Sequence, residues 1–178
     1  LRLGSGIAPV PLASRLGVPI GLAVDGSASN DSSDMVRELQ IAMLVHRVGT
    51  DVESMSARDA LRLATRGGAR VLGRDDVGAL APNMAADIAI FPLDDIGLAG
   101  AMHDPVAALA FTTGIRRARM VLINGRVVVE EGRVVGIDIA ELKTRADRLA
   151  TRMIDRSRER QRSIVPQPYR HRSSKENT

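Results

Sequence analysis

A near-continuous apolar run from Val18 to Val24 constrains the fold of this chain more than any other feature. Such a run is typical of a strand that is covered on both faces, as in a parallel sheet with helices on each side. The run stops at Asp25, and small or polar residues follow it until a helical pattern begins at Met35. We therefore expect a buried strand over 18–24 that delivers one carboxylate into a loop. This strand, loop and helix form one α/β repeat, and a single repeat cannot close a sheet by itself.

Helical patterns lie on both sides of this run. Residues 7–16 predict a short helix that starts at a proline and is stopped by Gly17. A longer helix is expected from Met35, because apolar side chains recur there at helical spacing. Its candidate N-caps are the polar residues just before it, Ser32, Ser33 and Asp34.

A third helix is expected after residue 55. Ser56 and Asp59 have the spacing of a capping pair, in which each side chain bonds the other residue's backbone N–H. Gly67-Gly68 is expected to end or break this helix, because glycine is a poor helix former and common at helix ends.

The chain changes character near Gly73. A strand is expected over 87–91, and Val-rich runs then flank Asn124-Gly125, a dipeptide that favours the type I′ hairpin turn. Glu131-Gly132 predicts a second turn shortly afterwards. These signals indicate a small antiparallel β unit that is distinct from the helical part before it.

An amphipathic helix is expected from Ile139, because apolar residues recur there at alternating spacings of three and four. These residues are Leu142, Ala146, Leu149 and Met153. The pattern ends after about Gln161, which predicts a mobile tail.

Composition excludes several classes of protein. The chain has no cysteine, so a disulfide framework and a Cys-ligated zinc site are both ruled out. No apolar run approaches the roughly 20 residues of a membrane span, and the opening lacks the pattern of a signal peptide. A cytoplasmic protein without a membrane partner is therefore expected. The loop-like opening at Leu1 hints at a missing N-terminal portion.

Because aromatics make up only 2% of the chain, the core must consist of Ala, Val, Leu, Ile and Met.

The basic charge of the chain belongs to its C-terminal segment. From Lys143 onward there are 11 Lys and Arg residues against four acidic ones, whereas the earlier part has 14 against 17. The charges in the segment alternate around an apolar stripe, which favours a solvated helix face over a nucleic-acid-binding surface.

Asp25 has two possible roles. It is either an ordinary turn residue or a functional carboxylate, because the functional groups of α/β barrels gather where strands end. A carboxylate in that position can bind a metal ion and exchange a proton with bound water. No nucleophile elbow, Walker loop or dinucleotide-binding glycine motif competes with it.

The histidines do not complete a metal site around Asp25. A catalytic zinc needs about three protein ligands and a water, and the chain contains no His-x-His pair. His46 is expected to be a packing or surface residue, and His103, before Asp104-Pro105, a turn residue. His171 lies in the expected tail. One carboxylate without matching imidazoles does not make a hydrolytic metal site.

Four stretches of the chain resemble the amidohydrolase superfamily. "GVPIGLAVDGSASNDSSDMVRELQIAMLVHRV" resembles the last barrel strand and following helix of its cytosine deaminase and chlorohydrolase branch. "SGIAPV" and "VDGSASNDSSD" are most similar to 8-oxoguanine deaminases and hydroxyatrazine-type aminohydrolases. "ATRGGARVLGRDDVGALAPNMAADIAIF" resembles the segment that leaves the barrel, with Asn83 in place of a usual glycine. "MVLINGRVVVEEGRVV" resembles two strands of the small β-sandwich beside it.

The resemblance covers residues 1 to about 160 and implies an α/β fold. The chain would be the C-terminal fragment of a (β/α)8 metal-dependent hydrolase barrel, with its last strand and helices, part of a small β-sandwich and a C-terminal helix. The implied divisions are 1–73 for the barrel, 74–137 for the sandwich, 138–162 for the helix and 163–178 for the mobile tail.

The resemblance also implies a chemistry. In the family, the aspartate that ends the eighth strand ligates the metal and carries a proton from the hydrolytic water to the leaving amine, and this role passes to Asp25. The implied cofactor is a divalent metal ion, with zinc favoured, whose other ligands are absent from this chain. The ion would lower the pKa of a bound water and generate hydroxide near neutral pH. Ser27 and Asn30 are candidate loop contacts to the substrate or to Asp25.

The full-length enzyme is expected to be a homo-oligomer that deaminates a small N-heterocycle, with an 8-oxoguanine-type purine favoured. The fragment alone is expected to be inactive. One alternative is another ring or leaving group within the same branch: guanine, cytosine, a triazine or a halide. The other is a non-enzymatic α+β interaction module in which Asp25 is a turn residue. An upstream His-x-His would favour the enzyme, and a chain complete at 178 residues would contradict it.

Overall fold

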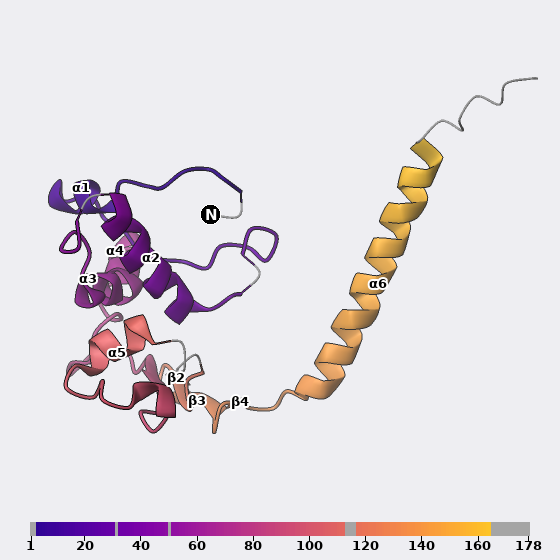
Figure 1. The fold of residues 1–178 in the computed structure, drawn as a ribbon. Coiled ribbons are helices and arrows are strands. Elements are labelled where there is room, and N and C mark those ends of the chain that lie inside the picture. The colour runs from indigo at the N-terminus through magenta and orange to yellow at the C-terminus, as the bar shows by residue number, and fades with distance from the viewer. Residues whose placement is uncertain (1–2, 31, 50, 113–116, 165–178) are drawn as a thin grey trace, which may run out of the picture. The chain divides into compact units, whose positions relative to one another are not determined.

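The computed structural model describes residues 3–30, 32–49, 51–112 and 117–164. The chain divides into two compact units, Leu1–Val135 and Gly136–Thr178, and each is described by itself. The first unit contains the helices α1 to α5 and a small sheet, and the second contains the long helix α6 (Figure 1). Among the described residues, no helix is both long enough and apolar enough to cross a membrane.

The first two helices follow the sequence signals closely. α1 spans Val10–Arg15 with a proline in its first turn, and the chain leaves it through Gly17 at a φ of +74°. α2 spans Met35–Gly49. The Asp34 carboxylate accepts hydrogen bonds from the backbone N–H groups of Val36 (3.0 Å) and Arg37 (3.2 Å). Of the three candidate N-caps, Asp34 therefore caps α2.

The third helical segment consists of three consecutive pieces, two α-helical and one π-helical. α3 spans Ala57–Arg62, the π-helical turn η1 spans Leu63–Gly67, and α4 spans Gly68–Val71. Ser56 and Asp59 form the expected capping box at its start. Gly67-Gly68 was expected either to end or to break this helix. The helix is broken there by the π-helical turn and then continues as α4.

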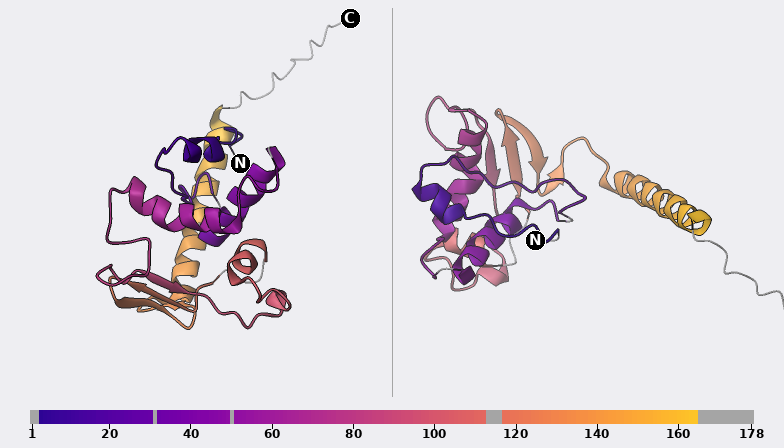
Figure 2. Two further views of the ribbon diagram at one scale, coloured as in Figure 1. Left: turned by 90° about the vertical axis from the view of Figure 1, so that its left-hand side faces the viewer. Right: turned by 90° about the horizontal axis from the view of Figure 1, so that it is seen from above.

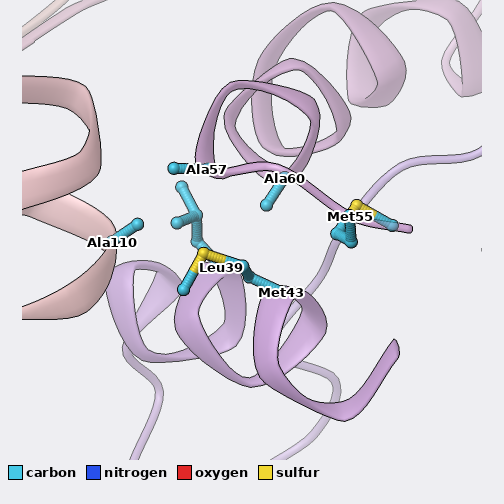
Figure 3. Close-up of a cluster of buried hydrophobic side chains, with 6 residues drawn as sticks. All are labelled: Leu39, Met43, Met55, Ala57, Ala60 and Ala110. Atoms are coloured by element: carbon cyan, nitrogen blue, oxygen red, sulfur yellow. The ribbon is translucent and has the colours of Figure 1, made fainter. Parts of the chain in front are cut away.

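The core of the first unit lies between α2, α3 and α5, which spans Pro105–Phe111. Figure 3 shows Leu39 and Met43 of α2 directed toward the small side chains of α3. The buried members of this cluster are Leu39, Met43, Met55, Ala57, Ala60 and Ala110. Alanine at the helix contacts lets the backbones approach closely, and methionine fills the remaining irregular space. The core thus consists of the aliphatic and Met residues that the composition predicts.

An ion pair links α3 to the start of α5. Asp104 caps α5 by accepting a hydrogen bond from the Ala107 N–H at 3.1 Å, and it also accepts two from the Arg58 guanidinium, at 2.7 and 3.1 Å. A short 3-10 helix, η2 (Ile96–Leu98), precedes α5 and buries Leu98 against Ala108.

The sheet is small and entirely antiparallel, with strands in the order β1-β2-β3-β4. The strands run side by side in the views of Figure 2. They are β1 Ile88–Ile90, β2 Met120–Ile123, β3 Arg126–Glu130 and β4 Arg133–Val134. Asn124 (φ +48°) and Gly125 (φ +74°) make the β2–β3 turn with the positive φ values of a type I′ turn. The expected antiparallel unit is confirmed, including its second turn at Glu131-Gly132.

The strand expected over 18–24 is not formed. These residues have no regular secondary structure, because a strand requires a neighbouring strand that pairs with its backbone. The backbone N–H of Leu22 instead donates a hydrogen bond of 3.2 Å to the carbonyl oxygen of Leu63. The segment therefore lies against the helical layer rather than in a sheet.

The second unit contains α6, which spans Ile139–Ile164. The Asp138 carboxylate accepts hydrogen bonds from the N–H groups of Ala140 and Glu141, which caps the helix. Lys143 and Asp147 form an ion pair of 2.7 Å one turn apart on its exposed surface. The expected amphipathic helix is confirmed, but it runs to Ile164, two residues into the tail expected over 163–178. The remaining residues of that expected tail, including His171, lie outside the described residues.

Candidate functional site

Asp25 stands where the irregular apolar segment turns into a polar loop. Its φ is +59°, in the left-handed region that few non-glycine residues adopt and that aspartate tolerates better than most. The loop then closes on itself, because the N–H groups of Ser29 and Asn30 both donate to the Gly26 carbonyl, at 2.9 and 3.0 Å. This tight turn leaves the Asp25 side chain exposed. Unusual backbone conformations of this kind cluster at functional sites.

The carboxylate of Asp25 is held in its ionised form. The Ser29 hydroxyl donates a hydrogen bond of 2.6 Å to Oδ2 of Asp25. This bond is the largest cause of the lowered pKa of Asp25, and the Gly26 backbone N–H adds to the lowering. A fixed, ionised and exposed carboxylate can ligate a cation or accept a proton.

Ser29 was not among the candidates from the sequence. The loop contains several serines, and only the turn that returns Ser29 to Asp25 distinguishes it from the others. Ser27 lies exposed in the same turn, and its contact with a substrate stays a prediction.

Asn30 organises the junction between the loop and α2. Its Oδ1 accepts hydrogen bonds from the backbone N–H (2.9 Å) and hydroxyl (2.8 Å) of Ser32, and its Nδ2 donates to Glu38 at 2.7 Å. These contacts are with the start of α2 rather than with Asp25, and any contact with a substrate stays a prediction.

The described residues do not make a complete metal site. Within the described ranges, no group of three or more His, Cys, Asp or Glu side chains gathers where a metal ion could bind. His46 is buried in α2 with 8% of its surface exposed, and burial lowers its pKa. The Nδ1 atom of His103 lies 3.2 Å from the Gly100 carbonyl oxygen, within a turn. Both positions agree with the packing and turn roles expected from the sequence. The role of Asp25 as a metal ligand stays a prediction.

An apolar groove of about 850 Å³ lies elsewhere in the first unit. It runs between the α3–α4 helical segment and β1, and Leu61, Val77 and Phe91 are among its lining residues. Neither Asp25 nor Ser29 is among its described lining residues. The groove therefore does not belong to the candidate site.

The chain belongs to the amidohydrolase family, whose model matches residues 1–128 and therefore includes the Asp25 loop. The chain is 44% identical to the 8-oxoguanine deaminase of Pseudomonas aeruginosa over 154 residues, which cover 86% of this chain and 34% of that protein. It is 38% identical to a 5-methylthioadenosine/S-adenosylhomocysteine deaminase of Pelotomaculum thermopropionicum, with 88% and 36% of the two chains covered.

A solved structure supports the same relationship. The zinc complex of the atrazine chlorohydrolase of Arthrobacter aurescens TC1 matches with a TM-score of 0.77 and 39% identity, over 83% of this chain and 33% of that one. The chain thus spans about a third of the length of the relatives it matches. Its mixed α/β architecture corresponds to that third of an amidohydrolase.

Proposed function

We propose that this chain is the C-terminal part of a metal-dependent deaminase of N-heterocycles, with an 8-oxoguanine-type purine as the favoured substrate. The single observation that carries the proposal is the Asp25 carboxylate, ionised and fixed at the start of a tight turn within the family-matched residues. The 44% identity to an 8-oxoguanine deaminase supports the choice of substrate class.

In the complete protein, residues 18–24 are the last strand of a (β/α)8 barrel. The preceding strand would supply the backbone partners that the segment lacks among the described residues. Residues 1–73 then belong to the barrel, 74–137 to a β-sandwich, and 138–162 to a C-terminal helix. The exposure of Val18 (50%) in the present chain supports this view, because a barrel would bury such an apolar side chain.

Asp25 performs two tasks in this proposal: it supplies one oxygen ligand to a divalent metal, with zinc favoured, and it carries a proton. The metal would supply the Lewis acidity that makes water a nucleophile near neutral pH. Asp25 takes a proton from the water as the water oxygen bonds to the ring carbon that bears the amine. It then gives that proton to the amine nitrogen as the carbon–nitrogen bond breaks. The second water proton moves from the oxygen to the ring nitrogen, so the products are ammonia and the ring carbonyl compound and all atoms are accounted for.

The loop around Asp25 suits both tasks. The Ser29 hydroxyl fixes the carboxylate and favours its ionised form, which is the form that ligates a cation and accepts a proton. Asn30 anchors the end of the loop to α2, so that the Asp25 turn starts and ends at fixed points. Ser27, exposed in the same turn, is our candidate for a direct contact with the substrate.

A triazine is the second candidate substrate class. The 39% identity to an atrazine chlorohydrolase over a similar share of the chain favours it, and the leaving group would then be a halide. The choice between the two classes depends on residues that contact the ring, and Asp25 is compatible with both.

The test is turnover by the purified complete protein, loaded with zinc, on a panel of 8-oxoguanine, guanine, cytosine, 5-methylthioadenosine and atrazine. Ammonia and chloride release distinguish the leaving groups. We expect ammonia from 8-oxoguanine with the highest kcat/KM of the panel, and none from the 178-residue chain assayed in parallel. Release of chloride from atrazine alone would favour the second candidate, and no turnover on any of these compounds would contradict the proposed function.

A further inference from the structure

The segment that leads to Asp25 crosses the helical layer at three glycines. A Cβ atom built on Gly67 would lie 2.2 Å from the backbone carbonyl oxygen of Ile20. A Cβ atom on Gly21 would lie 2.8 Å from Cα and 2.9 Å from the backbone nitrogen of Gly68. Real Cβ atoms essentially never approach within 3.0 Å of such atoms. The two backbones are therefore closer together than any side chain at Gly21 or Gly67 would permit.

The π-helical turn η1 forms the helical side of this contact. The Gly68 N–H donates to the Leu63 carbonyl five residues earlier, and the same carbonyl also accepts the hydrogen bond from the Leu22 N–H. Leu63 thus joins the helix to a residue that is only three positions before Asp25. Single π turns are frequently found at functional sites, because they displace the backbone locally from the α-helical path.

This contact determines where the backbone before Asp25 runs. Leu22 is hydrogen-bonded to the helical segment, and Ile20 and Gly21 contact it. Only two residues, Ala23 and Val24, separate this contact from Asp25. To bring the Ile20 oxygen from 2.2 Å to 3.0 Å, a methyl group at position 67 must move the segment or the helix by at least 0.8 Å. A misplacement of about 1 Å can reduce a catalysed rate by roughly 100-fold.

We infer that Gly67 and Gly21 are positioning residues for Asp25, which hold the carboxylate at its place in the metal site through a direct backbone contact between η1–α4 and residues 20–22. The inference rests on the proposed function of Asp25. Both glycines act through Asp25 and touch neither the substrate nor the metal.

The experiment compares Gly67→Ala with Gly68→Ala in the complete protein. Gly68 is the matched control, because it is the next residue of the same helix and a Cβ there meets no atom within 4 Å. Zinc affinity is measured by competition with a chelator, the cobalt-substituted protein gives a visible spectrum that reports ligand geometry, and kcat and KM are measured well below the melting temperature.

We expect Gly67→Ala to lower zinc affinity by about tenfold or more, to change the cobalt spectrum and to lower kcat by about tenfold to 100-fold with KM nearly unchanged. Gly68→Ala should match the parent in all four. In an Asp25→Asn background, Gly67→Ala should lower zinc affinity no further, because the two changes act on one interaction.

Parent-like zinc affinity and spectrum in folded Gly67→Ala would overturn the inference, as would fully additive losses in the double variant. If Gly67→Ala does not fold, Gly21→Ala provides the same comparison with a smaller overlap. Failure of both to fold would also overturn the positioning role, since a structural role then accounts for the contact. If Asp25→Asn leaves zinc affinity unchanged, the proposed role of Asp25 as a metal ligand is contradicted. If Asp25→Asn lowers zinc affinity but Gly67→Ala does not, only the positioning role of the glycines is contradicted.

Discussion

The Ser29 hydroxyl bonds the Asp25 carboxylate at 2.6 Å across a turn in which the two residues are four positions apart. The Gly26 carbonyl oxygen, 3.0 Å from the same hydroxyl, is a second acceptor within reach of its single proton. This relationship fixes the orientation of a carboxylate that would otherwise rotate freely in solvent.

Ser29→Ala in the complete protein should weaken zinc binding by roughly tenfold, because partners that orient a metal ligand commonly have effects of this size. Chelator competition measures the change. Ser27→Ala is the matched control from the same turn, and we expect it to leave zinc affinity unchanged while it raises KM. Equal effects of the two substitutions on zinc affinity would show that the Ser29–Asp25 bond has no special role.

Acid should weaken the contact between α3 and α5. Hydrogen bonds from Arg58 and from the start of α5 lower the pKa of Asp104 from 3.8 to about 2. A carboxylate with a lowered pKa in the folded state adds stability above its unfolded pKa, and that stability is lost as pH falls from about 4 to about 2. Because Arg58 is half exposed, salt screens the pair and the contribution is modest.

Asp104→Asn tests this directly, because asparagine keeps the N-cap and removes only the charge. The parent should melt at a higher temperature than Asp104→Asn at pH 5, and the difference should shrink toward pH 2. A difference in melting temperature that stays constant over this range would contradict the assignment.

Met43→Ala should destabilise the first unit strongly. Met43 has no exposed surface and lies at the centre of the cluster in Figure 3, so its truncation leaves a cavity among Leu39, Met55 and Ala60. Such truncations cost about 2–5 kcal/mol. Met35→Ala, in the same helix but 37% exposed, should cost much less. Equal losses in thermal stability for the two variants would contradict the core described above.

The sequence predicted the elements whose signals are local. The Asp34 cap, the Ser56–Asp59 capping box and the Asn124-Gly125 turn each depend on residues a few positions apart, and each forms as expected. Asn83 adopts a φ of +66°, in the left-handed region that asparagine tolerates better than most residues.

The features that were missed depend on distant partners. Residues 18–24 carry the apolar pattern of a strand, but a strand also needs a neighbour that pairs with it. The π turn at Leu63–Gly67 becomes intelligible only beside Ile20 and Leu22, some 40 residues earlier in the sequence. Ser29 could not be separated from its neighbouring serines without the geometry of the turn.

The 178-residue chain alone should be aggregated or partly molten, with helical circular dichroism but a broad melting transition. The backbone of residues 18–24 has few partners, and several large apolar side chains are well exposed, among them Val48 (89%), Leu72 (73%) and Leu80 (76%). Exposed apolar surface and unpaired backbone both promote association. A sharp, cooperative transition of a monomer would instead favour an independent interaction module.

The central claim is that Asp25 is a metal ligand and the proton carrier of a deaminase. The most direct measurement is the kcat of Asp25→Asn in the complete protein, assayed at the same zinc content as the parent. Asparagine keeps the shape of the side chain but loses its charge and its proton-accepting oxygen, so kcat should fall by about 100-fold to 10,000-fold while the fold remains intact. A kcat within about tenfold of the parent, at equal zinc content, would contradict the claim.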